Sequence, residues 1–178
     1  MKLPISYYGD PILRKQGKLI EKITPEIIEL AHNMIETMDA NNGVGLAANQ
    51  VGQELKLFVL RNPIITEEGH LALADPQFFI NPKITYYNKE IQIDPEPCIS
   101  IPGISANVER PTRIIVEAID LNGEIFVEAA EGYKARVIMH ENDHVNGVLF
   151  IDRVSEKDRK RLEPELRALK KKLESRKR

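Results

Sequence analysis

Residues 133 to 150 read YKARVIMHENDHVNGVLF and contain an HExxH motif at residues 140 to 144. Apolar residues recur at helical spacing here, and an Asn-Gly pair that is typical of a helix end follows the motif. With 3.6 residues in a turn, His140 and His144 project from one helix face, where they can hold one metal ion. Glu141 lies beside them, placed to handle the protons of a water molecule at that metal. The stretch predicts a metal-binding helix, although two unrelated histidines on a surface helix are the alternative.

A catalytic metal of this kind needs a third protein ligand and one open position. Two of the four histidines remain, but His32 falls on another predicted helix and His70 in a predicted surface loop. Cys98 is the better candidate, because it lies in a proline-rich bend where its thiolate can point inward. An unreactive buried thiol is the alternative for a cysteine considered alone.

The rest of the chain predicts one further core helix and several antiparallel strands. Thr24 to Ala40 has a capping threonine, a proline in the first turn and an apolar stripe. Alternating or β-branched runs predict the strands, and an Asn-Gly turn at 122 and 123 predicts a hairpin. The strand segments are 54–63, 82–89, 90–103 and 113–132, and 63–77 is predicted to be a surface loop. We therefore expect an α+β fold in which antiparallel strands surround the HExxH helix.

The last two dozen residues differ in charge from the rest of the chain. Ser155 to Arg178 holds 11 basic and 5 acidic residues, a net charge of +6, whereas residues 1–154 carry −8. Leucines at helical spacing predict a C-terminal helix with one apolar stripe, which Pro164 could kink. We expect residues 1–154 to form a single catalytic domain and residues 155–178 a basic helical extension packed on it. The extension is either a solvated helix or a docking helix for an acidic partner such as ribosomal RNA.

Composition excludes several classes of protein. The net charge of the whole chain is −2, so it lacks the basic field of a dedicated nucleic-acid-binding protein. No stretch has the roughly 20 apolar residues that a membrane span needs, and the first residues do not resemble a secretory signal. A single cysteine excludes an internal disulfide. We expect a cytoplasmic protein.

Three ordered motifs resemble those of the peptide deformylase family. They are GVGLAANQ at 43–50, EPCIS at 96–100, and HENDH at 140–144 followed by a glycine at 147. The resemblance extends from Tyr8 to Arg153 and includes GDPILR, FINP and GVLFIDR. It implies a metal-dependent hydrolase that removes the N-formyl group from the initiator methionine of nascent polypeptides and releases formate.

The resemblance also implies roles for individual residues. Cys98, His140 and His144 would bind the metal, and Glu141 would be the general acid and base. The Gln50 carboxamide and the Ile99 backbone N–H would hold the formyl oxygen, whose developing charge needs such donors. The residues implied to bind the substrate are Val44, Gly45, Pro97, Tyr133 and Val137.

The same resemblance implies a cofactor and partners. The family works best with ferrous iron, although a Cys-His-His set also suits zinc, and nickel or cobalt could substitute. The partners would be N-formylmethionyl nascent peptides and the ribosome near its exit tunnel, contacted by the C-terminal helix. No membrane and no sequence-specific nucleic acid is expected as a partner.

Residues around the motifs support or modify this interpretation. Asp143 cannot reach the metal together with both histidines, so we expect it to orient a partner, Arg110. Glu96 belongs to the hydrogen-bonding shell of the site in the family. Arg136 and Tyr133 are expected to make the methionine pocket more polar and bulkier.

Three positions depart from the family pattern: Pro97 replaces a common glycine, Met139 a glutamine, and Asn49 a proline or threonine. These changes bear on substrate preference and rate more than on reaction type. The alternatives are an HExxH peptidase that cleaves internal peptide bonds, and a catalytically silent metal-bearing or ribosome-binding module.

Overall fold

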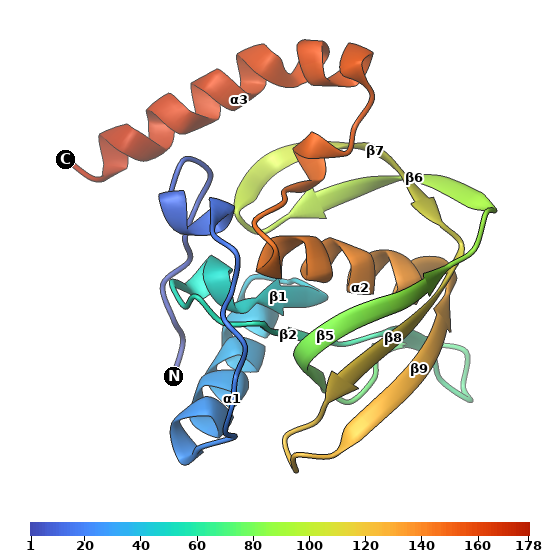
Figure 1. Ribbon diagram of the computed structural model, residues 1–178. Coiled ribbons are helices and arrows are strands. Elements are labelled where there is room, and N and C mark those ends of the chain that lie inside the picture. The colour runs from blue at the N-terminus through green and yellow to red at the C-terminus, as the bar shows by residue number, and fades with distance from the viewer.

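The structure, a computed structural model, describes residues 1–178 and has an α+β fold (Figure 1). The predicted helices are present, and Thr24 and Ser155 cap the first and the third. None of the helices combines the length and apolar composition that crossing a membrane requires. The helices are α1 (Pro25–Ala40), α2 (Gly132–Val145) and α3 (Glu156–Arg176), and the short 3-10 helices are η1 (Pro11–Arg14), η2 (Ala48–Val51) and η3 (Phe150–Asp152).

An antiparallel sheet of five strands forms one side of the molecule, in the order β1-β2-β5-β8-β9. Its strands are β1 (Gly45–Ala47), β2 (Leu57–Leu60), β5 (Gln77–Tyr87), β8 (Arg113–Ile119) and β9 (Ile125–Glu131). The predicted β8–β9 hairpin is confirmed, with Gly123 at a φ of 82° in its turn. Strand β1 is an edge strand, paired only with β2, so its other edge is open to a further strand.

Two hairpins form separate two-stranded sheets. Strand β6 (Ile91–Cys98) pairs with β7 (Ile101–Pro111), and β3 (Pro63–Ile65) pairs with β4 (Leu71–Leu73). The prediction of a surface loop over residues 63–77 is therefore wrong. Strands of three residues are too short to show a periodicity, and the acidic turn between them dominates the local composition.

Helix α2 lies between the five-stranded sheet and the β6–β7 hairpin, and α1 covers the opposite face of the sheet (Figure 1). Strand β2 is buried on both faces, which explains its continuous apolar sequence. Phe58 and Leu60 join the core cluster that includes α2, and Leu57 and Val59 join the cluster that includes α1. The predicted enclosure of the HExxH helix by antiparallel strands is confirmed.

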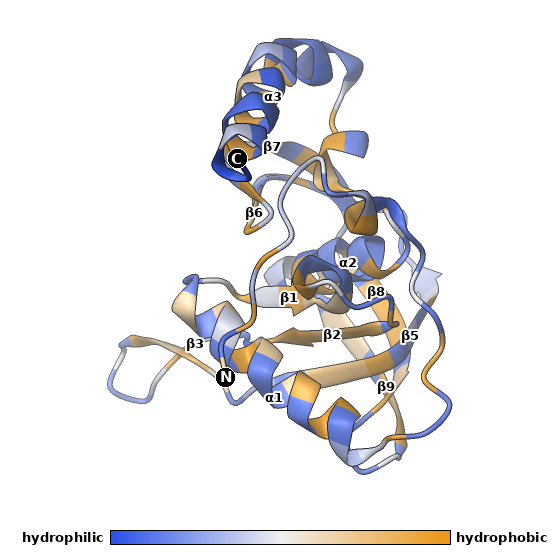
Figure 2. Cartoon of the chain, turned by 90° about the vertical axis from the view of Figure 1, so that its left-hand side faces the viewer, coloured by the Kyte–Doolittle hydropathy of each residue, from blue (hydrophilic) through white to orange (hydrophobic).

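Helix α3 lies outside this layered core but is anchored to the molecule. Leu162, Leu166 and Leu173 are buried, and the first two share a cluster with Leu13 and Phe150. Pro164 lies inside the helix without ending it. In Figure 2 the remaining surface of α3 is mostly hydrophilic. In the structure, α3 is therefore a solvent-exposed helix that packs on the molecule through one apolar stripe.

Candidate active site

Both ends of the helix that carries the HExxH motif depend on glycine. Gly132 begins α2 at a φ of 61°, and Gly147 follows it at a φ of 75°. A Cβ on Gly147 would lie 2.5 Å from the backbone oxygen of Arg14, so no larger residue fits this close approach. These ends fix the helix so that the rings of His140 and His144, one turn apart, lie 5.0 Å from each other.

Cys98 joins the two histidines from the end of β6. Its Sγ lies 3.3 Å from Nε2 of His144, and the possible ligand atoms of the three residues all lie within 4.8 Å of one another. One thiolate and two imidazoles are a donor set that binds a divalent transition metal and leaves a fourth position open. The residues present therefore fit a catalytic metal, and neither His32 nor His70 is part of the group.

The orientation of the His140 ring and the protonation of the His144 ring both suit metal ligation. Nδ1 of His140 lies 2.8 Å from a carboxylate oxygen of Glu96, which leaves Nε2 free to face the group. Burial lowers the pKa of His144 well below its ordinary value, and the positive charges of His140 and Arg110 lower it further. A neutral ring is the form that binds a metal.

Glu96 is the centre of a buried ionic network that joins β6, β7 and α2. Arg110 donates two hydrogen bonds to its carboxylate, at 2.9 and 2.8 Å, and Arg136 donates one at 2.6 Å. Burial would raise the pKa of Glu96, but the hydrogen bonds from Arg110 and His140 outweigh it and hold that pKa well below its ordinary value. Arg110 also donates to Asp143 at 2.8 Å, which confirms the predicted pairing.

Gln50 is fixed by bonds at both ends of its carboxamide. Its Oε1 accepts from the backbone N–H of Ala47 at 2.9 Å, and its Nε2 donates to the Ser100 hydroxyl at 3.1 Å. The same nitrogen lies 3.7 Å from Sγ of Cys98, which places it beside the candidate metal ligands. Ser100 is fully buried and was not singled out from the sequence, although it is the last residue of the EPCIS motif.

Glu141 lines the same cleft as Gln50 and Cys98 and has no hydrogen-bond partner for its carboxyl group. Its Oε2 is buried and makes no hydrogen bond. Burial, together with the negative charges of Glu96 and Asp143, raises its pKa to about 7 although His140 opposes the change. A carboxyl group that titrates near neutrality can both accept and return a proton.

Gly45 provides the space that Glu141 occupies. A Cβ on this glycine would lie 2.6 Å from Oε1 of Glu141, closer than any side chain allows. Strand β1 therefore passes directly beside the carboxyl group, with its open edge available to a peptide.

These groups open into a cleft of about 500 Å³ between β1, α2 and the β6–β7 turn. The Ile99 N–H has no hydrogen-bond partner in the chain and is free to donate. The cleft is lined by the residues that the sequence predicts to be catalytic or to bind substrate. They are Val44, Gly45, Gln50, Pro97, Ile99, Tyr133, Val137 and Glu141. The structure thus brings all of them together with the candidate metal ligands.

Arg136 was expected to make the pocket wall more polar, but its guanidinium is occupied elsewhere. It is buried and donates to Glu96 and to the backbone oxygens of Val108 and Gln92. Its main structural effect is to tie α2 to the β6–β7 hairpin. The sequence analysis did not single out the cleft residues Tyr7, Asn41, Asn42, Pro102 and Arg176. Of these, Arg176 lies far from every motif.

Comparison with known proteins decides the family. The model of the polypeptide deformylase family matches residues 2–160. A peptide deformylase of Acinetobacter baumannii is 43% identical over 160 residues, which cover 90% of this chain and 87% of that protein. The chain belongs to the peptide deformylase family. It is a hydrolase that removes the N-formyl group from nascent polypeptides, and deformylases are metal-dependent.

Solved deformylase structures agree with the fold. The deformylase of Thermotoga maritima is 40% identical, has a TM-score of 0.78, and is matched over 87% of this chain and 99% of that one. The deformylase of Ehrlichia chaffeensis is 35% identical, has a TM-score of 0.87, and is matched over 98% of each chain.

The departures from the deformylase pattern occupy different environments. Asn49 is buried, and its amide donates to the backbone oxygen of His144, so it helps to hold the ligand helix. Met139 packs into the apolar cluster under the sheet. Pro97 is exposed and lines the cleft, where it lacks an N–H but keeps a carbonyl oxygen.

Proposed function

We propose that Cys98, His140 and His144 hold one divalent cation and that the cleft above them binds the formylmethionine of a nascent chain. The observation that carries this proposal is the position of three ligand atoms within 4.8 Å of one another in the same cleft as Glu141 and Gln50. An HExxH peptidase for internal peptide bonds is disfavoured, because the third ligand here is a cysteine from an upstream strand.

The reaction requires charge on the formyl oxygen to be stabilised and a proton to be moved. A bound cation would polarise the formyl group and lower the pKa of a water molecule. The Nε2 of Gln50 and the N–H of Ile99 would donate to the oxygen as it becomes negative. Glu141, with a pKa of about 7, would take the proton of the attacking water and return it to the leaving amine.

The substrate backbone would bind as an added strand. Strand β1 has one open edge in the cleft, and main-chain hydrogen bonds to such an edge bind extended peptides without regard to their sequence. On the opposite side, the Pro97 carbonyl would accept a hydrogen bond from the peptide. Val44, Tyr133 and Val137 would enclose the methionine side chain, whose recognition gives the selectivity.

Ferrous iron is the ion that we propose, with zinc, nickel and cobalt as substitutes. The test is formate release from a formyl-Met-Ala-Ser peptide under anaerobic conditions, with iron and zinc enzymes compared at equal metal content. We expect faster turnover with iron and its loss in Glu141→Ala. The control is Asn142→Ala, one residue further along α2 and outside the cleft lining. Absence of formate release from metal-replete wild-type enzyme would contradict the proposal.

We also propose that residues 1–154 form one catalytic domain and that residues 155–178 pack on it as an extension that docks on the ribosome. Support comes from the net charge of +6 in the extension and from the leucines that bury its other side. Nascent substrates on ribosomes would place the enzyme in the cytoplasm.

Deletion of α3 is a poor test of docking, because it would uncover the cluster around Leu13 and Phe150. Reversing exposed charges, as in Lys157→Glu with Lys171→Glu, leaves the buried leucines in place. We expect this double variant to keep its melting temperature and lose co-sedimentation with ribosomes at low salt. Unchanged co-sedimentation would refute the docking role.

A further inference from the structure

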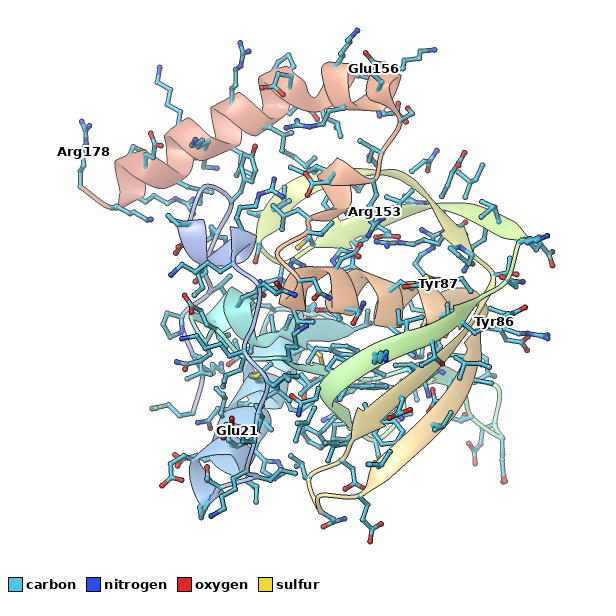
Figure 3. The ribbon with its side chains drawn as sticks, viewed as in Figure 1. Glu21, Tyr86, Tyr87, Arg153, Glu156 and Arg178 are labelled. Atoms are coloured by element: carbon cyan, nitrogen blue, oxygen red, sulfur yellow. The ribbon has the colours of Figure 1, made fainter.

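The last turn of α3 reaches the substrate cleft. Arg176 lines this cleft although it is 32 residues beyond His144 and belongs to an element outside the layered core. Figure 3 shows α3 extending from Glu156 toward the chain end at Arg178, above the N-terminal segment. Helix α3 therefore contributes a side chain to the active-site opening.

This position of Arg176 is held by packing of residues in the two preceding turns of the helix. Leu173 is buried, and residues three apart lie on the same helix face, so Arg176 projects from the face that contacts the molecule. One turn and a half earlier, the Lys170 side chain lies over Gly9, where a Cβ would be 3.4 Å from Cγ and Cε of the lysine. Tyr7, two residues before Gly9, also lines the cleft.

Arg176 is the only charged side chain at the mouth of the cleft. The exposed residues among those that line it are Tyr7, Asn41, Asn42, Pro95, Pro97, Pro102, Tyr133 and Arg176. The buried cation of the lining, Arg136, is already paired with Glu96. Arg176 makes no salt bridge and no side-chain hydrogen bond, so its guanidinium can accept a new anionic partner.

We propose that Arg176 is a specificity-determining residue that favours nascent peptides with an acidic side chain downstream of the formylmethionine. The inference rests on the proposed function, because a peptide held along β1 with its formyl group at Cys98 must leave through this mouth. A carboxylate on the emerging chain would meet one exposed guanidinium. Within residues 170–178, Glu174 is the only acidic residue that could compete for it.

The test is a comparison of kcat/KM for three peptide amides, formyl-Met-Ala followed by Glu-Glu, Gln-Gln or Lys-Lys. At low salt we expect wild-type enzyme to prefer the Glu-Glu peptide over the Gln-Gln peptide by about two- to fivefold, the range of an exposed ion pair. Arg176→Gln should remove this preference, and Arg176→Glu should reverse it in favour of Lys-Lys. At 1 M salt, where the screening length is about 3 Å, the wild-type preference should disappear.

Lys171→Gln is the matched control, because Lys171 is exposed on the same helix and does not line the cleft. The proposal is overturned if the preference survives in Arg176→Gln, or if Lys171→Gln removes it equally, which would assign it to the overall charge of α3. Formyl-Met-Ala-amide, which has no residue beyond the alanine, separates the two proposals. Failure of wild-type enzyme to deformylate it would refute the proposed function itself.

Discussion

The Glu96 carboxylate lies 2.8 Å from Nδ1 of His140 and at the same time accepts hydrogen bonds from Arg110 and Arg136. One buried acid thus orients a candidate metal ligand and joins the β6–β7 hairpin to α2. A carboxylate in this position fixes the histidine tautomer and makes the ring a better ligand. The local stability of the fold and the orientation of a candidate metal ligand therefore depend on the same carboxylate.

Replacing Glu96 by glutamine should therefore weaken metal binding. The amide keeps the size of the side chain but removes the charge, and loss of such a partner typically reduces metal affinity about 10- to 100-fold. Competition with a chromogenic chelator measures the affinity. Asp94→Asn is the control, since this acid lies two residues away on β6 with a largely exposed side chain. Equal affinities of Glu96→Gln and wild-type enzyme would contradict the assignment.

Arg110→Met should destabilise the fold much more than Arg113→Met. Arg110 pairs with two buried carboxylates at 2.8 Å. Its loss leaves Glu96 and Asp143 with less positive charge to offset the cost of burying their own charges. Removal of one member of a buried pair costs about 3–5 kcal/mol, whereas an exposed pair such as Arg113–Glu131 contributes about 0–1 kcal/mol. Urea unfolding monitored by circular dichroism gives both free energies, and similar values for the two variants would be inconsistent with this network.

Gly45→Ala should reduce activity with little loss of metal. The added Cβ would meet Oε1 of Glu141 at 2.6 Å, so the carboxyl group must move away from its position beside the metal ligands. A displacement of about 1 Å can lower kcat/KM about 100-fold. Gly43→Ala should have a milder effect, because its Cβ would meet the flexible end of Ile99. Formate release and bound metal are measured for both variants. A greater loss of activity in Gly43→Ala than in Gly45→Ala would contradict this order.

The stability of the metal-free enzyme should depend on pH through Glu141. Its pKa rises from 4.5 to about 7 on folding, chiefly by burial, so the folded state holds the proton more tightly. The free energy of unfolding should then fall as pH rises from about 4.5 to about 7 and level off above that, by about 3 kcal/mol in total.

Glu141→Gln removes this titration. After treatment with a chelator, the variant should be more stable than wild-type enzyme at pH 8, and the difference should vanish near pH 4.5. Thermal unfolding across this pH range provides the measurement. A difference that stays constant with pH would show that Glu141 is not held in a raised-pKa environment.

The local elements could be predicted because their signals lie within a few residues. Caps at Thr24 and Ser155 and the glycine at 147 mark helix ends that the structure has. The three motifs likewise identify the candidate metal ligands. In contrast, the pairing of β2 with β5 and the position of β1 at an edge depend on long-range contacts that no local pattern encodes.

The environment of the cleft was only partly predictable for the same reason. Arg136 lines the cleft, but the buried Glu96 carboxylate binds its guanidinium, and this pairing depends on desolvation in the folded state. Arg176 reaches the cleft because Leu173 and Lys170 fix the end of α3 over a loop more than 150 residues earlier. Neither relationship has a signature in the sequence.

The packing of α3 also affects when the enzyme matures during its own synthesis. Cys98 belongs to the same apolar cluster as Leu162 and Leu166, so one candidate metal ligand lies in a core that is completed by residues synthesised long after it. Domains fold as the chain emerges from its N-terminus. On the ribosome, the apolar cluster around Cys98 can therefore close only after these leucines have emerged.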